Sequence, residues 1–348
     1  MFRHNPARTG ALPDATGPQR SISEQWSFNA AERGVLSSPV RVGNTVYVGG
    51  GGSQEADGDI YALSAADGSE QWSYQTEGSV ISSSAVVDGT VYVGSGEGDG
   101  NIYALSAADG SEQWSYQTGG VVNSSPAVAS GTVYIGSTVG NVYALSVSDG
   151  SERWVFDADS TTVNSSPAVI NDTVYIGTRT GRVYALSAAD GSEQWSTQIG
   201  ARVGSSPAVV NDTVYVGSND GTVYALSASD GSEQWSYRTG ARVFSSPAVV
   251  ENTVYVGSYD STVYALSASD GSEQWTYQTE GRISSSPAVV NDVVYIGSFD
   301  NNMYALSAAD GSEQWSHQTG GAIFSSPAVG DDTVYVGSGD GNVYALSD

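Results

Sequence analysis

Eight tryptophans recur at nearly equal intervals, and this spacing constrains the fold more than any other feature of the sequence. The successive intervals are 46, 42, 40, 41, 40, 40 and 40 residues, between Trp26, Trp72, Trp114, Trp154, Trp195, Trp235, Trp275 and Trp315. A period near 40 residues built from several short β-patterned runs is typical of a propeller or a repeat array. The 348 residues are therefore expected to form one repeat domain rather than a string of independent domains.

The unit at residues 203–238 predicts four strands joined by tight turns. The strands, called A to D, are expected at Ser205–Val210, Thr213–Gly217, Thr222–Ser227 and Glu233–Tyr237. Asn, Asp and Gly tolerate positive φ, so Asn211-Asp212 and Ser229-Asp230-Gly231 are expected to form the A–B and C–D turns. Strand B alternates Val and Tyr, which puts apolar side chains on both faces. This pattern predicts a blade packed between two neighbours, with the tryptophan between blades and Gly217 allowing close approach.

The two ends of the sequence predict how the ring closes. Residues 23–28 have the pattern of a strand D without A, B or C before it, and residues 342–347 that of a strand C without D after it. Eight starts of strand A match eight D strands only if residues 23–28 complete the last blade. We therefore predict an all-β, eight-bladed β-propeller with four antiparallel strands per blade and 3+1 closure by the N-terminal strand. The propeller domain is expected at 21–348, preceded by a leader segment at 1–20.

Charge limits the classes of partner. The formal net charge is −26, from 38 acidic and 12 basic residues, and every basic residue is arginine. Such a field opposes nucleic acids and anionic membrane surfaces, and it destabilises the folded state unless salt screens it. An acidic, lysine-free composition resembles that of proteins from salt-loving archaea. We therefore expect a halophilic monomer that binds no nucleic acid.

The sequence carries no cysteine and no membrane-spanning pattern. Without cysteine, disulfides, thiolate nucleophiles and cysteine-based metal sites are impossible. No apolar run approaches the roughly 18 residues that a membrane span needs. Residues 1–20 lack the apolar core of a signal peptide. The cellular location therefore stays open: exported or at the cell surface if a signal once preceded Met1, and cytoplasmic otherwise.

The segment Tyr-Ala-Leu-Ser-Ala-Ala-Asp-Gly-Ser-Glu-Gln-Trp at residues 61–72 resembles the tryptophan-docking motif of the pyrroloquinoline quinone family of β-propellers. The motif recurs in every blade, and the resemblance covers residues 21–348. The opening Met-Phe-Arg-His-Asn-Pro-Ala-Arg-Thr-Gly is similar to the segment that leads into haloarchaeal propellers of this family. One departure is Ser64, where the family has Asp after Ala-Leu. The resemblance implies three classes of function.

The first class is a quinone-dependent dehydrogenase. In that family the quinone lies at the ring axis, usually against a disulfide of adjacent cysteines. A calcium ion held by Glu, Asn and Asp polarises it, and an Asp acts as base. The disulfide is impossible here, and residues 222–235 and 262–275 are identical, whereas catalysis needs one carboxylate that differs from its copies. We therefore predict no enzymatic activity, no catalytic residue and no pyrroloquinoline quinone.

The second class is a metal-binding propeller. One face would carry seven hairpin aspartates, namely Asp67, Asp109, Asp149, Asp190, Asp230, Asp270 and Asp310. Aspartates of the A–B turns, such as Asp172 and Asp212, would lie on the same face. Ca²⁺ or another hard cation could collect there, because such ions take six to eight oxygen ligands. Turn formation explains these residues without an ion, so no specific metal site is predicted.

The third class is a non-catalytic scaffold that binds a protein or a small ligand, as the barrel-assembly lipoprotein of bacterial outer membranes does within the resembled family. Binding residues are expected where blades differ, and the residue before each strand A varies from Gly to Phe. This position is expected to line the mouth of the central channel. We predict a binding surface there, made of Leu36, Ile81, Phe244, Phe324, Arg202, Arg242 and Arg282.

Two further arginines, Arg179 and Arg182, are expected beside this surface in a B–C loop. The sequence does not identify the partner protein. The high identity between repeats also fits a recently amplified or engineered ring without an evolved ligand. The scaffold is the favoured hypothesis, and the other classes stay open as alternatives.

Overall fold

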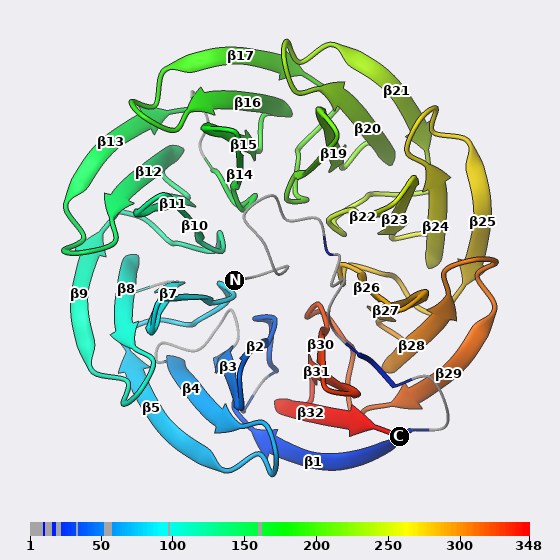
Figure 1. Cartoon of the computed structure of the whole chain (residues 1–348), viewed down its shortest axis with the longest axis horizontal. Helices are drawn as coiled ribbons and strands as arrows, with labels where there is room; N and C mark the ends of the chain where they lie inside the picture. The colour runs from blue at the N-terminus through cyan, green and yellow to red at the C-terminus, as the bar shows by residue number, and fades with distance from the viewer. Residues whose placement is uncertain are drawn as a thin grey trace.

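The protein is an eight-bladed propeller. The computed structural model describes residues 10, 16–18, 22–32, 34–51, 58–96, 98–158 and 162–348. Within these residues, eight four-stranded antiparallel sheets are arranged as blades around a central axis, which we call the channel (Figure 1). The predicted all-β architecture with four strands per blade is therefore confirmed. The predicted leader falls mainly outside the described residues, although Gly10 and residues 16–18 lie against the ring.

Each blade runs from strand A at the channel to strand D at the outer wall (Figure 1). The A strands are β2 (Val40–Val42), β6 (Ala85–Val87), β10 (Ala127–Ala129), β14 (Ala168–Ile170), β18 (Ala208–Val210), β22 (Ala248–Val250), β26 (Ala288–Val290) and β30 (Ala328–Gly330). The B strands are β3 (Thr45–Gly49), β7 (Thr90–Gly94), β11 (Thr132–Gly136), β15 (Thr173–Gly177), β19 (Thr213–Gly217), β23 (Thr253–Gly257), β27 (Val293–Gly297) and β31 (Thr333–Gly337).

The outer half of each blade consists of strands C and D. The C strands are β4 (Gly58–Ser64), β8 (Asn101–Ser106), β12 (Asn141–Ser146), β16 (Arg182–Ser187), β20 (Thr222–Ser227), β24 (Thr262–Ser267), β28 (Asn302–Ser307) and β32 (Asn342–Ser347). The D strands are β5 (Glu70–Thr76), β9 (Glu112–Gln117), β13 (Glu152–Asp157), β17 (Glu193–Gln198), β21 (Glu233–Arg238), β25 (Glu273–Gln278), β29 (Glu313–Gln318) and β1 (Ser23–Asn29). Blades are numbered 1 to 8 by their A strands in chain order.

Blade 8 closes the ring with strands from both ends of the sequence. Its order is β1-β32-β31-β30, and β1 pairs antiparallel with β32 so that Trp26 lies opposite Ala345. The predicted 3+1 closure by the N-terminal strand is therefore confirmed. Since β1 and β32 are not consecutive in the chain, no C–D hairpin joins them.

The repeat unit matches the predicted bounds in two strands, extends them by one residue in a third and differs in strand A. Strands β19 and β20 have the predicted bounds, and β21 extends one residue further, to Arg238. The turn residues Asn211 and Asp212 have φ of 49° and 59°, as expected. Strand A was wrongly predicted to start at Ser205, whereas β18 starts at Ala208. The reason is that the Ser206 N–H donates to Ser246 of the next blade at 2.9 Å, while Pro207 has no N–H to give a strand ladder.

These serines form a closed ring of hydrogen bonds around the channel. Each blade has a pair of serines before strand A, and the second of the pair makes the bond. Its backbone N–H donates to the side-chain oxygen of the equivalent serine in the next blade, at 2.8–3.1 Å. The eight residues are Ser38, Ser83, Ser125, Ser166, Ser206, Ser246, Ser286 and Ser326. The last bond runs from Ser326 back to Ser38, so the innermost layer is continuous. The repeated Ser-Ser-Pro is thus a junction between blades.

One blade departs from this pattern in a way that predicts a stabilising substitution. Seven blades have proline after the second serine, but blade 2 has Ser84, whose buried side-chain oxygen lacks a hydrogen-bond partner in the described structure. Proline would remove this oxygen and restrict the unfolded chain. Ser84→Pro is therefore expected to raise the free energy of unfolding by about 1–2 kcal/mol in urea titrations. The reverse exchange in blade 5, Pro207→Ser, is the matched control and should lower the free energy of unfolding. If Ser84→Pro destabilised the protein, proline would not be the favoured residue at this position.

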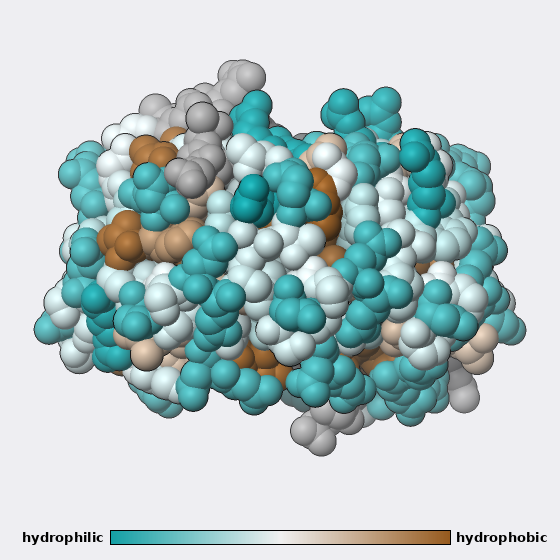
Figure 2. Space-filling model, turned by 90° about the horizontal axis from the view of Figure 1, so that it is seen from above, coloured by the Kyte–Doolittle hydropathy of each residue, from teal (hydrophilic) through white to brown (hydrophobic). Residues whose placement is uncertain are grey.

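The hydrophobic core lies between blades. In blade 5, Val214 and Val216 of β19 pack with Trp195 of blade 4, whereas Tyr215 points the other way and packs with Val249 of blade 6. This confirms that both faces of a blade are buried. Gly217 permits the close approach, because a Cβ there would lie 2.4 Å from Val243 Cγ1. The outer D strands expose most of their polar side chains, and the side view of the ring is mainly hydrophilic (Figure 2).

The described part of the chain contains no helix long and apolar enough to span a membrane.

Candidate functional site

Two loops of each blade meet on one face of the ring and frame the channel mouth. One is the D–A loop that leads into the blade, and the other is its B–C loop. In blade 6 the Tyr259 N–H donates to the Arg242 carbonyl at 2.9 Å, and in blade 7 the Phe299 N–H donates to the Arg282 carbonyl at 2.9 Å. These bonds hold the two loops side by side. The variable residue before the two serines that precede strand A therefore lies close to the B–C loop of the same blade.

Four aromatic side chains form an unbroken row across blades 6, 7 and 8, which we call the aromatic ladder: Phe244, Tyr259, Phe299 and Phe324. The distance between ring centroids is 4.8 Å for Phe244 and Tyr259, 5.7 Å for Tyr259 and Phe299, and 4.5 Å for Phe299 and Phe324. Phe324 is 37% exposed and the other three are half-buried. The structure thus joins the predicted residues Phe244 and Phe324 through two rings that the sequence reasoning missed.

The sequence did contain a signal for the two missed rings. Tyr259 and Phe299 occupy the same position in their B–C loops, and this position varies as strongly as the one before the serine pair. Other blades have Thr138, Arg179, Asn219 and Gly339 there. Comparing both variable positions, rather than one, would have indicated the ladder.

Two of the predicted arginines lie over rings of the ladder. The guanidinium carbon of Arg202 is 6.0 Å from the centroid of Phe244, and that of Arg282 is 5.7 Å from the centroid of Tyr259. Both distances are in the range of cation–π attraction. Burial raises the pKa of Tyr259, and the positive charges of Arg282 and Arg242 oppose this shift. The Tyr259 phenol therefore stays neutral near pH 7 and can donate a hydrogen bond to a ligand.

No carboxylate pairs with the arginines of the mouth in the described structure, and Arg202 lies near Arg179. Burial lowers the pKa of Arg202, and the charge of Arg179 in the B–C loop of blade 4 lowers it further. Among the described residues, the one ion pair joins Arg41 to Asp331, on the face of the A–B turns. Arg182, predicted to lie in the B–C loop, is instead the first residue of β16 and donates to the Ser196 side chain at 3.0 Å. The positive arc therefore consists of Arg179, Arg202, Arg242 and Arg282.

The rest of the mouth has a different character. The predicted residues Leu36 and Ile81 are half-buried and belong to blades 1 and 2, outside the ladder. Blades 3, 4 and 5 contribute Asn123, Asn164 and Asn219, whose buried side-chain oxygens have no hydrogen-bond partner in the described structure. The aromatic ladder thus lies in blades 6 to 8, these amides lie in blades 3 to 5, and the positive arc runs across both, from blade 4 to blade 7. Of the predicted surface residues, Phe244 and Phe324 belong to the aromatic ladder, whereas Leu36 and Ile81 do not.

Four aspartates near the mouth make nearly the same hydrogen bonds within their own blades: Asp220, Asp260, Asp300 and Asp340. Asp260 accepts a hydrogen bond from the Tyr264 hydroxyl at 2.7 Å and another from the Thr262 N–H at 3.0 Å, and the other three make the corresponding bonds. A quinone and calcium centre needs several converging oxygens and one distinct carboxylate. These residues do not fit such a centre. The described residues also contain no group of three His, Asp or Glu side chains that could hold a metal ion.

The hairpin aspartates on the opposite face serve their own turns. Asp230 accepts hydrogen bonds from the Ser232 N–H at 3.1 Å and the Ser232 hydroxyl at 2.7 Å, and the other six aspartates repeat this arrangement. The Ser232 hydroxyl, the Ser232 N–H and then the Ser227 hydroxyl lower the pKa of Asp230. This face therefore carries a regular row of ionised carboxylates, each engaged by a serine.

The repeat sequence itself identifies the family. The family model described as outer membrane protein assembly factor BamB matches residues 15–166, 154–250 and 240–348, which together cover most of the chain. The chain belongs to this family. BamB from Moraxella catarrhalis has the same fold, with a TM-score of 0.78 and 18% identity over 94% of this chain and 98% of that chain.

Two other solved structures share the fold of this BamB-family propeller. The computationally designed Ika8 protein has a TM-score of 0.81 and 19% identity, covering 93% of this chain and 99% of Ika8. A europium-containing methanol dehydrogenase has a TM-score of 0.81 and 15% identity, covering 100% of this chain and 97% of the dehydrogenase. No curated protein sequence matches the chain. At these identities the structures share only a fold with this chain, and that fold occurs in BamB, in a dehydrogenase and in a designed protein.

Proposed function

We propose that this BamB-family propeller is a non-enzymatic binding module that docks a partner protein at the channel mouth. The aromatic ladder carries the proposal. Packing of the ring does not require it, because the equivalent positions of other blades hold Asn, Gly and Thr. Partly exposed aromatic rings next to arginines are the usual composition of an interaction hot spot.

The charge distribution indicates the chemistry of the partner. Arg179, Arg202, Arg242 and Arg282 gather on one arc of a protein with a net charge of −26, and no ion pair occupies them in the described structure. A partner segment with carboxylates would complement this arc, and its apolar side chains would contact the ladder. At about 1 M salt the Debye length is only ~3 Å, so the apolar contacts would then carry most of the affinity.

The residues at the mouth support a binding function rather than a catalytic one. Catalysis requires an acid or base that differs from its neighbours, whereas the four aspartates near the mouth have equivalent surroundings. Family membership supports the same choice, since the family is described as an assembly factor. The dehydrogenase that shares the fold supports the alternative through its fold alone.

Site-specific photo-cross-linking tests the proposal. A benzoylphenylalanine introduced at Phe324, irradiated in cells of the source organism, is expected to give a discrete covalent adduct with one partner. Arg202→Gln, Arg242→Gln and Arg282→Gln together are expected to weaken this adduct at low salt, because the attraction to the partner's carboxylates is lost.

Two exposed valines provide matched controls. Val139 is 45% exposed in the B–C loop of blade 3, on the same face but outside the ladder, and Val42 is 43% exposed near the A–B turn of blade 1, on the opposite face. The cross-linker at either position is expected to give no such adduct. Equal adducts from residues 42, 139 and 324, or none from 324, would show that the ladder is not the docking site.

A further inference from the structure

One kind of contact recurs between neighbouring blades on the face of the C–D hairpins. The indole N–H of the strand D tryptophan donates to a hairpin carbonyl of the next blade, at 2.8–3.0 Å, in seven of the eight junctions. In most junctions the strand B tyrosine donates to the same carbonyl. Between blades 6 and 7, for example, Trp275 and Tyr255 both donate to the Ala308 carbonyl, at 2.9 and 3.3 Å.

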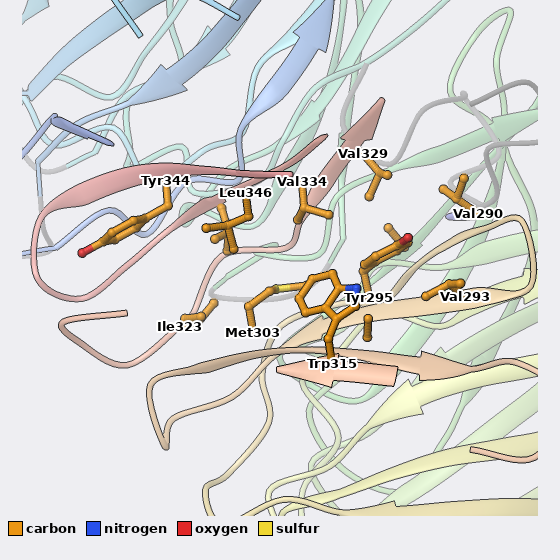
Figure 3. Packing of buried hydrophobic residues seen from close by; sticks show 13 residues of the cluster. Val290, Val293, Tyr295, Met303, Trp315, Ile323, Val329, Val334, Tyr344 and Leu346 are labelled. Atoms are coloured by element: carbon orange, nitrogen blue, oxygen red, sulfur yellow. The ribbon is translucent and has the colours of Figure 1, made fainter. Parts of the chain in front are cut away.

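The eighth junction, between blades 7 and 8, has no hairpin to supply this carbonyl, because β32 and β1 are not consecutive in the chain. Trp315 and Tyr295 lie side by side there, within a cluster of buried residues (Figure 3). Both donate to the carbonyl of Pro18, at 3.0 Å from the indole nitrogen and 2.8 Å from the hydroxyl. Pro18 therefore takes the place of the missing hairpin residue.

Backbone contacts fix the position of this N-terminal segment. The Asp332 N–H in the A–B turn of blade 8 donates to the Thr16 carbonyl at 3.1 Å, and the Val289 N–H of β26 donates to the Gly10 carbonyl at 3.1 Å. Gly17 and Pro18 are buried, whereas Thr16 is exposed. Residues 16–18 thus lie on the face of the turns and hairpins, away from the aromatic ladder.

Glycine at position 17 is a steric requirement of the junction. A Cβ on Gly17 would lie 2.6 Å from the Tyr295 hydroxyl oxygen and 2.8 Å from Val329 Cγ1. Both contacts are far shorter than van der Waals distances, and Tyr295 is fully buried and cannot easily move away. The junction therefore selects a glycine followed by a residue that presents its carbonyl to Trp315 and Tyr295.

We infer that the junction between blades 7 and 8, where Tyr295, Trp315 and Val329 meet residues 16–18, is a peptide-binding site that selects a glycine followed by a residue presenting its carbonyl, and that residues 16–18 occupy it as an intramolecular ligand. Its selectivity has two parts, the carbonyl that accepts two hydrogen bonds and the absence of a side chain at the glycine. Because the ligand is tethered, its effective concentration is in the millimolar range, which excludes weaker competitors. This site is independent of the proposed function at the mouth.

A peptide in trans tests the inference on the full chain. Gly17→Val is expected to displace the segment and open the binding site. A fluorescent peptide of residues 10–22 should then bind this variant at least about tenfold more tightly than the parent chain, as measured by anisotropy. The same peptide with Gly17→Val should not bind. Thr16→Ala, which changes an exposed side chain of the same segment, should behave like the parent.

A second measurement covers the case in which the Gly17→Val chain does not fold. The protein has no cysteine, so Thr16→Cys and Asp332→Cys introduce a single pair beside the hydrogen bond that joins these residues. Oxidation is expected to give a cross-linked monomer that no longer takes up the peptide, while the reduced form exchanges its segment for excess peptide. Failure to cross-link, a cross-linked dimer, or equal peptide binding by the oxidised and reduced forms would overturn the inference.

Discussion

Replacing Trp26 with alanine is expected to lower the free energy of unfolding by about 3–5 kcal/mol, the range for truncating a buried aromatic residue. Trp26 is 8% exposed, its ring centroid is 5.8 Å from that of Tyr335, and its indole N–H donates to the Ala65 carbonyl at 3.0 Å. It thus links the closing strand β1 to both blade 8 and blade 1. Urea unfolding followed by circular dichroism measures the loss.

Gln25→Ala is the matched control, because Gln25 lies on the same strand with its side chain exposed. It is expected to change the free energy of unfolding by less than about 0.5 kcal/mol. Removing residues 1–30 altogether should have a larger effect than either substitution. Without β1, strand β32 becomes an open edge that can pair with other chains, so size-exclusion chromatography should show aggregates. A monomeric truncation with the stability of the parent would mean that β1 does not close the ring.

The architecture could be predicted from sequence because the repeat displays each structural requirement eight times. A single glycine such as Gly217 is a weak signal, but the same glycine at the end of every strand B indicates a constant steric constraint. The ring closure could be predicted by comparing the numbers of strands: with eight A strands, the eighth D strand had to come from residues 23–28. Strand A was predicted three residues too long, because the local pattern does not reveal that Ser206 bonds to the next blade.

The proposed binding surface was less predictable, because it depends on contacts between blades that differ from one another. Phe244 and Phe324 stood out as variable residues, yet only the structure shows that Tyr259 and Phe299 connect them. The position of Pro18 between blades 7 and 8 could not be predicted from the sequence either. Residues 16–18 share no pattern with the hairpins they replace, since their role depends on one backbone carbonyl and on the space left by a glycine.

Raising the KCl concentration from about 0.1 to 2 M is expected to raise the thermal midpoint steadily, because the Debye length falls from ~10 Å at 0.1 M to ~3 Å at 1 M. The net charge of −26 is largely uncompensated, and the described residues form one ion pair. Serine hydrogen bonds lower the pKa of the hairpin aspartates, Asp230 among them, so these charges persist in any buffer near neutrality. Circular dichroism melts at each KCl concentration measure the midpoint.

A charge-reduced variant separates screening from a general effect of salt on hydrophobic burial. Glu32, Glu77, Glu251 and Glu280 are exposed, and replacing all four with glutamine keeps their size while changing the net charge from −26 to −22. Screening predicts a higher midpoint for the variant at low salt and a shallower rise with KCl, whereas salt acting through hydrophobic burial predicts parallel curves. A parent midpoint that stays flat across the KCl range would refute the halophilic interpretation, since self-repulsion would then be too weak to limit stability.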